Sequence, residues 1–161
     1  MKETTADDDL GELLQEFVNR ISHLQGNTLA VLTEESVTLQ QVLLLRRLQQ
    51  VGESTLSDLA LRMRMSAPAI SQMIDRLFVL GLISRVEADD DRRRKKLSLT
   101  RKGGSLLERV RRARASEYTA GTSGLSAKLR ADLHAVMRRA LKELPREAET
   151  LALSPPQARA S

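Results

Sequence analysis

Two short helices joined by a tight turn restrict the fold of this chain more than any other feature. Thr55 and Asp58 have the spacing of a capping box, which predicts a helix from Leu56 to about Arg62. Residues 63–65 form the turn, and Ser66 caps a second helix that runs to Leu80. Ile70, Ile74, Leu77 and Phe78 are its expected buried residues.

A charged hairpin follows this helix pair. Leu82 to Glu87 is typical of a strand, and Lys95 to Leu99 alternates in the manner of its partner. The residues between them, 89–94, are three aspartates followed by three arginines. Helix, turn, helix and charged hairpin is the order of a winged helix-turn-helix.

Helical patterns flank this centre on both sides. A stripe of leucines predicts a helix from Leu10 to about Leu32, broken at 34–36, and Thr38 caps a helix to Val51. Thr100 caps a long helix to about Tyr118, a flexible joint covers 119–124, and Ser126 caps a last helix. The apolar stripe of that last helix comprises Leu129, Leu133, Val136, Met137, Leu141 and Leu144. The fold class is therefore mostly α with a small β-wing.

Composition excludes several classes of protein. The 161 residues contain no cysteine, which removes disulfides and thiolate metal sites, and two histidines give little basis for a metal centre. With no nucleophile motif either, we expect no enzyme and no cofactor. No apolar stretch reaches the length of a membrane span, and the acidic start is not that of a signal peptide. The expected location is the cytoplasm.

Positive charge is concentrated in the middle of the chain. Residues 62–114 hold 15 Lys/Arg against 6 Asp/Glu, whereas the remainder is net acidic. This distribution favours a polyanion such as double-stranded DNA as partner, with a solvated face as the alternative. The second helix of the pair would enter the major groove by its N-terminal end. The expected contacts there are Ser66, Ala67, Pro68, Ser71 and Gln72, with Arg76 on phosphate.

The hairpin tip fits the same partner. A projecting arginine suits a narrow minor groove, and Asp91 is placed to hold Arg93. Arg92 and the run Arg94 to Lys96 are expected to touch phosphate or solvent. The alternative is a solvated loop.

An ordered set of motifs resembles the MarR family of bacterial transcriptional regulators. The set comprises Val37-Thr38-Leu39-Gln40-Gln41, Leu56 to Leu59-Ala60, the Ser66–Leu77 helix, Leu80-Gly81-Leu82-Ile83-Ser84-Arg85, Asp91-Arg92-Arg93 and Leu99-Thr100-Arg101-Lys102-Gly103. Ala88-Asp89-Asp90-Asp91 lacks the proline usual at the start of the wing, which predicts weaker affinity or a steeper salt dependence.

The resemblance implies a homodimer that binds a pseudo-palindromic operator, most often as a repressor. It implies residues 1–35 and 104–153 as dimerisation segments, 36–103 as the DNA-binding domain with recognition helix 66–80 and wing 88–96, and 154–161 as a disordered tail. Arg93 would lie in the minor groove, with Asp91 as its support.

Such regulators commonly respond to a small phenolic or carboxylate effector. Asn19, Arg20, His23 and Arg46, or Arg47 in its place, are candidate ligands for a carboxylate, with surface charges as the simpler interpretation. Two rival functions remain open at this point, a protein-binding winged helix and an architectural, weakly sequence-specific DNA-binding protein.

Overall fold

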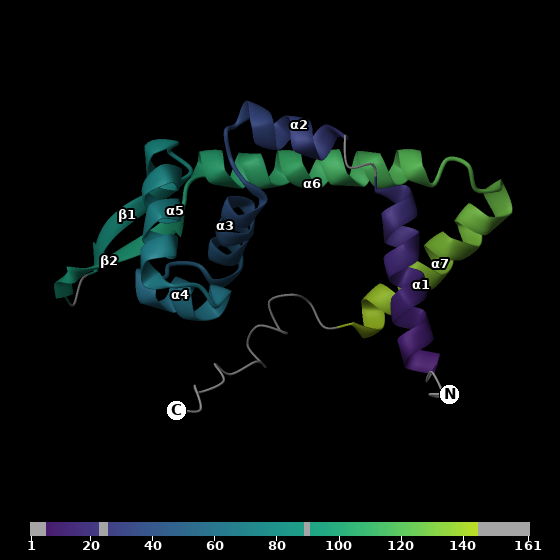
Figure 1. Ribbon diagram of the computed structural model, residues 1–161, viewed down its shortest axis with the longest axis horizontal. Helices are drawn as coiled ribbons and strands as arrows, with labels where there is room; N and C mark the ends of the chain where they lie inside the picture. Colours follow the sequence, from purple (N-terminus) through teal and green to yellow (C-terminus); the bar gives the residue numbers. More distant parts are fainter. Residues whose placement is uncertain (1–5, 23–25, 89–90, 145–161) are drawn as a thin grey trace. The chain divides into compact units, whose positions relative to one another are not determined.

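The structure is a computed structural model that describes residues 6–22, 26–88 and 91–144 of the chain. Figure 1 shows the elements that these residues form. In chain order they are α1 (Ala6–Ile21), α2 (Asn27–Glu34), α3 (Leu39–Val51), α4 (Leu56–Met63), α5 (Ala67–Val79), β1 (Ile83–Ala88), β2 (Asp91–Leu99), α6 (Arg101–Gly121) and α7 (Ala127–Glu143). The mostly helical fold with one small sheet confirms the expected fold class.

The described residues pack as two compact units. One contains residues 37–108 and 139–144, and thus α3, α4, α5, both strands and the start of α6. The other contains α1, α2 and residues 109–138. No helix in the described part of the chain is both long and apolar enough to span a membrane.

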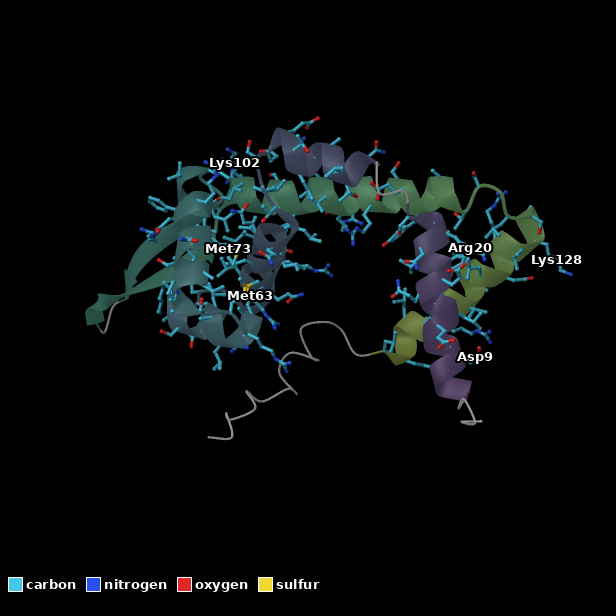
Figure 2. The ribbon with its side chains drawn as sticks, viewed as in Figure 1. Asp9, Arg20, Met63, Met73, Lys102 and Lys128 are labelled. Carbon is cyan, nitrogen blue, oxygen red and sulfur yellow. The ribbon has the colours of Figure 1, made fainter. Side chains whose placement is uncertain are left out.

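The first of these units, which we call the winged-helix unit, has its core where α3, α4 and α5 meet the hairpin of β1 and β2. Leu44, Leu45 and Leu48 of α3 are fully buried, as are side chains from each neighbouring element. Those neighbours are Leu59, Ile70, Leu77, Leu82 and Ile83. Met73, labelled in Figure 2, is also buried in this core, although it was not among the residues predicted to be buried. Phe78 was expected in the core, but its side chain is 45% exposed, and its ring contacts an arginine of β1 rather than the core.

Local capping fixes the boundaries of these helices as expected. The Thr38 hydroxyl accepts the Gln41 N–H, and the Gln41 side chain accepts the Thr38 N–H, so that a full capping box opens α3. Thr55 and Asp58 form the same arrangement at α4. The predicted starts of these two helices are therefore confirmed.

The hairpin is longer on one side than its sequence pattern indicated. Its antiparallel register pairs Ile83 with Leu99 and continues to Ala88 opposite Asp91, with an irregularity after Glu87. The second strand therefore begins at Asp91, within the segment expected to be a loop. Backbone hydrogen bonds between Ser54 and Leu97 join the hairpin to the segment before α4.

The expected helix from Leu10 to Leu32 is wrong, because two helices occupy this region. Gly26 is the extended N-cap of α2 and supplies no side chain to cap it. The carboxylate of Glu117 instead accepts the Thr28 N–H at 2.7 Å, and a Cβ on Gly26 would collide with that side chain. A residue far along the chain thus stabilises the start of α2, which lies in the middle of the apolar pattern that predicted a single helix.

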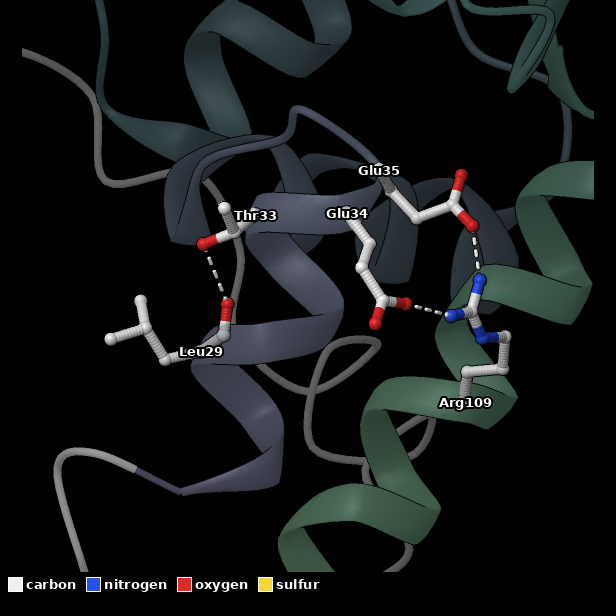
Figure 3. Close-up of polar contacts among 5 residues, drawn as sticks. All are labelled: Leu29, Thr33, Glu34, Glu35 and Arg109. Carbon is white, nitrogen blue, oxygen red and sulfur yellow. Dashed lines mark hydrogen bonds and ion pairs between the residues drawn. The ribbon is translucent and has the colours of Figure 1, made fainter.

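The same unit is held by an arginine on α6. The Arg109 guanidinium donates to Glu34 Oε2 at 2.7 Å and also pairs with Glu35, both at the end of α2 (Figure 3). The helix α6 continues to Gly121, three residues beyond the expected end and into the segment expected to be a joint.

Ser126 caps α7 as predicted, because its hydroxyl accepts the Leu129 N–H at 3.2 Å.

Candidate nucleic-acid interface

The exposed side of α5 carries the side chains expected to contact bases. Ala67, Pro68, Gln72 and Arg76 are exposed and Ser71 is half-buried, while Ile70 and its apolar neighbours face the core. Ser66 caps the helix, with its hydroxyl 3.4 Å from the Ala69 nitrogen. The helix therefore presents small and hydrogen-bonding groups at its N-terminal end. Their contact with DNA stays a prediction.

The turn before this helix has at its centre a residue with an unusual backbone conformation. Arg64 ends α4 in the left-handed conformation, with φ of 53° and ψ of 41°. Its N–H bonds to the Leu61 carbonyl at 3.2 Å, and the next N–H, of Met65, bonds to the Ala60 carbonyl at 3.0 Å. These bonds close the turn and lead the chain directly into the Ser66 cap.

The base of the wing is fastened to α5 by Arg85. Its guanidinium pairs with the Asp75 carboxylate and lies 4.7 Å from the centre of the Phe78 ring. An ion pair and a cation–π contact from one side chain hold β1 against the helix. Arg85 belongs to one of the motifs, but its role could not be predicted from the sequence, because its partners on α5 come close only in the fold.

The Leu99-Thr100-x-x-Gly103 motif has a structural explanation in the loop after α5. The Thr100 hydroxyl donates to the Gly81 carbonyl at 2.8 Å and accepts the Gly103 N–H at 3.1 Å. Lys102, labelled in Figure 2, donates to the Leu80 carbonyl at 2.9 Å. A Cβ on Gly103 would lie 2.2 Å from the Leu82 carbonyl oxygen, so only glycine permits this approach. The motif therefore holds the end of β2 and the start of α6 against the loop that follows α5.

The four wing residues expected at DNA have a described backbone only. Asp91, Arg92, Arg93 and Arg94 lie in β2, and their side chains, like residues 89–90, lie outside what the structure describes. Lys96 is described, and its ammonium group lies 3.5 Å from the Glu53 carboxylate. An intramolecular partner thus competes with the phosphate expected there.

Three of the four candidate effector ligands lie on two helices, α1 and α3. Asn19 accepts a hydrogen bond from Gln15 at 2.9 Å, and Arg20 pairs with Glu16 at 2.7 Å, both within α1. Arg46 lies exposed on α3, and His23 lies outside the described residues. Their role in effector binding stays a prediction. In the described part of the chain, no three His, Asp or Glu side chains are grouped as a metal site.

Comparison with known proteins identifies the segment that carries this geometry. Residues 37–95 match the model of the MarR family. Through this segment the chain is similar to the MarR family. The match covers the helices, the turn and most of the hairpin described above.

Relatives of the MarR segment are named as regulators. The chain is 32% identical over 99 residues to the uncharacterized HTH-type transcriptional regulator YhbI of Bacillus subtilis, covering 62% of each chain. It is 34% identical over 87 residues to the HTH-type transcriptional repressor MdtR of Bacillus subtilis, covering 54% of this chain and 56% of that one. The matched part thus spans about 60% of these relatives. Their names agree with the expectation that the chain is not an enzyme.

A solved structure extends the likeness beyond the MarR segment. The YusO protein from Bacillus subtilis superposes with a TM-score of 0.64 and 26% identity, over 89% of this chain and all of that one. The helices that flank the winged helix therefore belong to the shared fold as well.

Proposed function

We propose that this chain is a DNA-binding transcriptional regulator of the MarR type. The observation that carries the proposal is the exposed face of α5, which presents small and hydrogen-bonding residues inside a segment that matches the MarR family. The names of the relatives YhbI and MdtR support a regulatory role, and that of MdtR supports repression. A repressor of this kind acts in the cytoplasm, where the chromosome is accessible.

Recognition would divide between the helix and the wing. The N-terminal end of α5 lies in the major groove, where Gln72 can read adenine by two hydrogen bonds and Ala67 can touch a thymine methyl. Arg93, supported by Asp91, lies in the minor groove, where the negative potential favours an arginine. Arg76 and the neighbouring wing arginines neutralise phosphates.

The working form would be a homodimer. Apolar side chains of α1 and α7 are exposed in the single chain, among them Leu13 at 59% and Leu141 at 66%. Contiguous apolar stripes of this kind are covered in stable soluble proteins. Dimerisation through them would place two copies of α5 about one turn of DNA, roughly 34 Å, apart on a pseudo-palindrome. A small phenolic or carboxylate effector that binds the dimer would release it from DNA.

The alternative function is that of an architectural protein with little sequence preference. The observation in its favour is the net positive charge of residues 62–114, which binds any duplex. The two functions differ in their specificity ratio, because an architectural protein binds chosen and mixed sequences almost equally.

Selection from a random duplex pool at physiological salt tests the proposal. An enriched palindrome with half-sites about 10 base pairs apart is the expected result. No enrichment, with binding that disappears as salt rises, would favour the architectural function. No binding to any duplex at low salt would overturn both.

A further inference from the structure

Arginine occupies a backbone position in the helix-turn-helix where other residue types fit with less strain. Arg64 has φ of 53°, a region that side chains other than glycine and asparagine avoid. Two other helix ends in the winged-helix unit also have positive φ, at the close of α3 and α5. Both carry glycine, Gly52 with φ of 75° and Gly81 with φ of 70°. Within this unit the turn before α5 is thus the exception, and its side chain has a cost that glycine would avoid. In the other unit Ser36, after α2, is a second non-glycine residue with positive φ.

Nothing described inside the protein explains this arginine. The backbone N–H of Arg64 is bonded within the turn, so the fold uses the main chain. The side chain is exposed, and its guanidinium forms no hydrogen bond or ion pair with the residues that the structure describes. The acidic residues of the two helices that the turn joins have other partners, Asp58 of α4 with Thr55 and Asp75 of α5 with Arg85.

The position of the turn indicates what the side chain would bind. Arg64 stands two residues before Ser66, the cap of the helix whose N-terminal end faces DNA in the proposed function. A residue just before that end lies beside the phosphates that flank the bases being read. A guanidinium binds a phosphate by two parallel hydrogen bonds, which a glycine or asparagine cannot do.

We propose that Arg64 is a DNA-backbone contact, held in the left-handed turn so that its guanidinium clamps a phosphate next to the recognition helix. The inference rests on the proposed function, and it adds a residue that the sequence analysis did not assign. It implies that stability and DNA affinity oppose each other at this position. Replacement by glycine relieves the backbone strain and removes the guanidinium that binds the phosphate.

The test compares Arg64→Gly, Arg64→Asn and Arg64→Lys with the wild-type chain. Titrations use two duplexes of equal length, one of mixed sequence and one enriched from the random pool, at several salt concentrations. Arg64→Gly and Arg64→Asn are expected to bind both duplexes about tenfold more weakly. The salt slope should become shallower by about 0.9 for each phosphate that the variant no longer neutralises. The Tm of Arg64→Gly should stay the same or rise by about 2 °C, and Arg64→Lys should keep most of the salt slope.

Arg114→Gln is the matched control, because it removes one exposed positive charge from α6 outside the winged-helix unit. It should leave the salt slope almost unchanged. Unaltered affinity and slope in Arg64→Gly would overturn the inference while wild-type binding keeps the proposed function intact. A weakening confined to the enriched duplex would also overturn it, because a phosphate contact is blind to sequence. If Arg64→Lys binds as weakly as Arg64→Gly with an equally shallow slope, a positive charge at this position neutralises no phosphate, and the inference is overturned.

Discussion

At the scale of single residues, Gly103 and Gly104 offer a direct test of how α6 joins the hairpin. A Cβ on Gly103 would lie 2.2 Å from the Leu82 carbonyl oxygen and 2.7 Å from Leu99, whereas on Gly104 the nearest atom is 4.0 Å away. We expect Gly103→Ala to lower the free energy of unfolding by about 2 kcal/mol, because the backbone at Leu82 must move to make room for the added Cβ. Gly104→Ala should instead raise it by up to about 1 kcal/mol, through helix propensity. Urea unfolding of both variants measures the difference, and equal effects would contradict the close approach.

Gln72 is the residue at which base preference is tested most simply. Its side chain is exposed on α5 and contributes nothing to the core, so Gln72→Ala should leave the Tm unchanged. We expect the variant to select a different base inside each half-site, with a loss of about 1–3 kcal/mol of discrimination at that position. Repeating the pool selection with the variant gives the measurement. An unchanged preferred sequence would mean that α5 does not enter the groove as proposed.

At the scale of elements, what the sequence could predict depends on how far apart the interacting residues lie along the chain. Thr38, Thr55 and Ser66 cap helices through partners three residues on, so their helix starts were predicted correctly. The start of α2 depends on Glu117, 89 residues beyond Thr28, and the apolar pattern ran through it unbroken. In the candidate site, the exposed face of α5 followed from its periodicity, whereas the Arg85 contacts with another element did not.

The Arg85 contacts make a prediction about how the wing is held on α5. Asp75 is 62% exposed, so its ion pair with Arg85 contributes little to stability, below about 1 kcal/mol. We expect Asp75→Asn to leave the Tm within 2 °C or so, yet to speed hydrogen exchange at the β1 amides and to weaken binding to duplex DNA. Glu16→Gln removes an ion pair of similar exposure from α1 and is the control. Unchanged exchange in β1 would show that the remaining contacts hold the wing without the ion pair between Asp75 and Arg85.

At the scale of the whole molecule, we expect the exposed apolar stripes of α1 and α7 to form the dimer interface that tight DNA binding requires. Leu13 is 59% exposed in the single chain, so a charge at this position disturbs no internal packing. We expect Leu13→Asp to convert a dimer into a folded monomer, because dimerisation would bury the carboxylate without a partner. Sedimentation velocity measures the oligomeric state, and circular dichroism confirms the helical content.

The same variant separates the two proposed modes of DNA binding. A specific regulator needs both half-sites, so monomeric Leu13→Asp should lose at least about a hundredfold in affinity for an enriched palindrome. Its affinity for a mixed-sequence duplex should change far less, because electrostatic contacts are made by each winged helix alone. Gln15→Asp makes the same change of charge on α1 outside the apolar stripe and should stay dimeric. A Leu13→Asp monomer that still binds the palindrome as tightly as the wild type would show that recognition does not need the second copy.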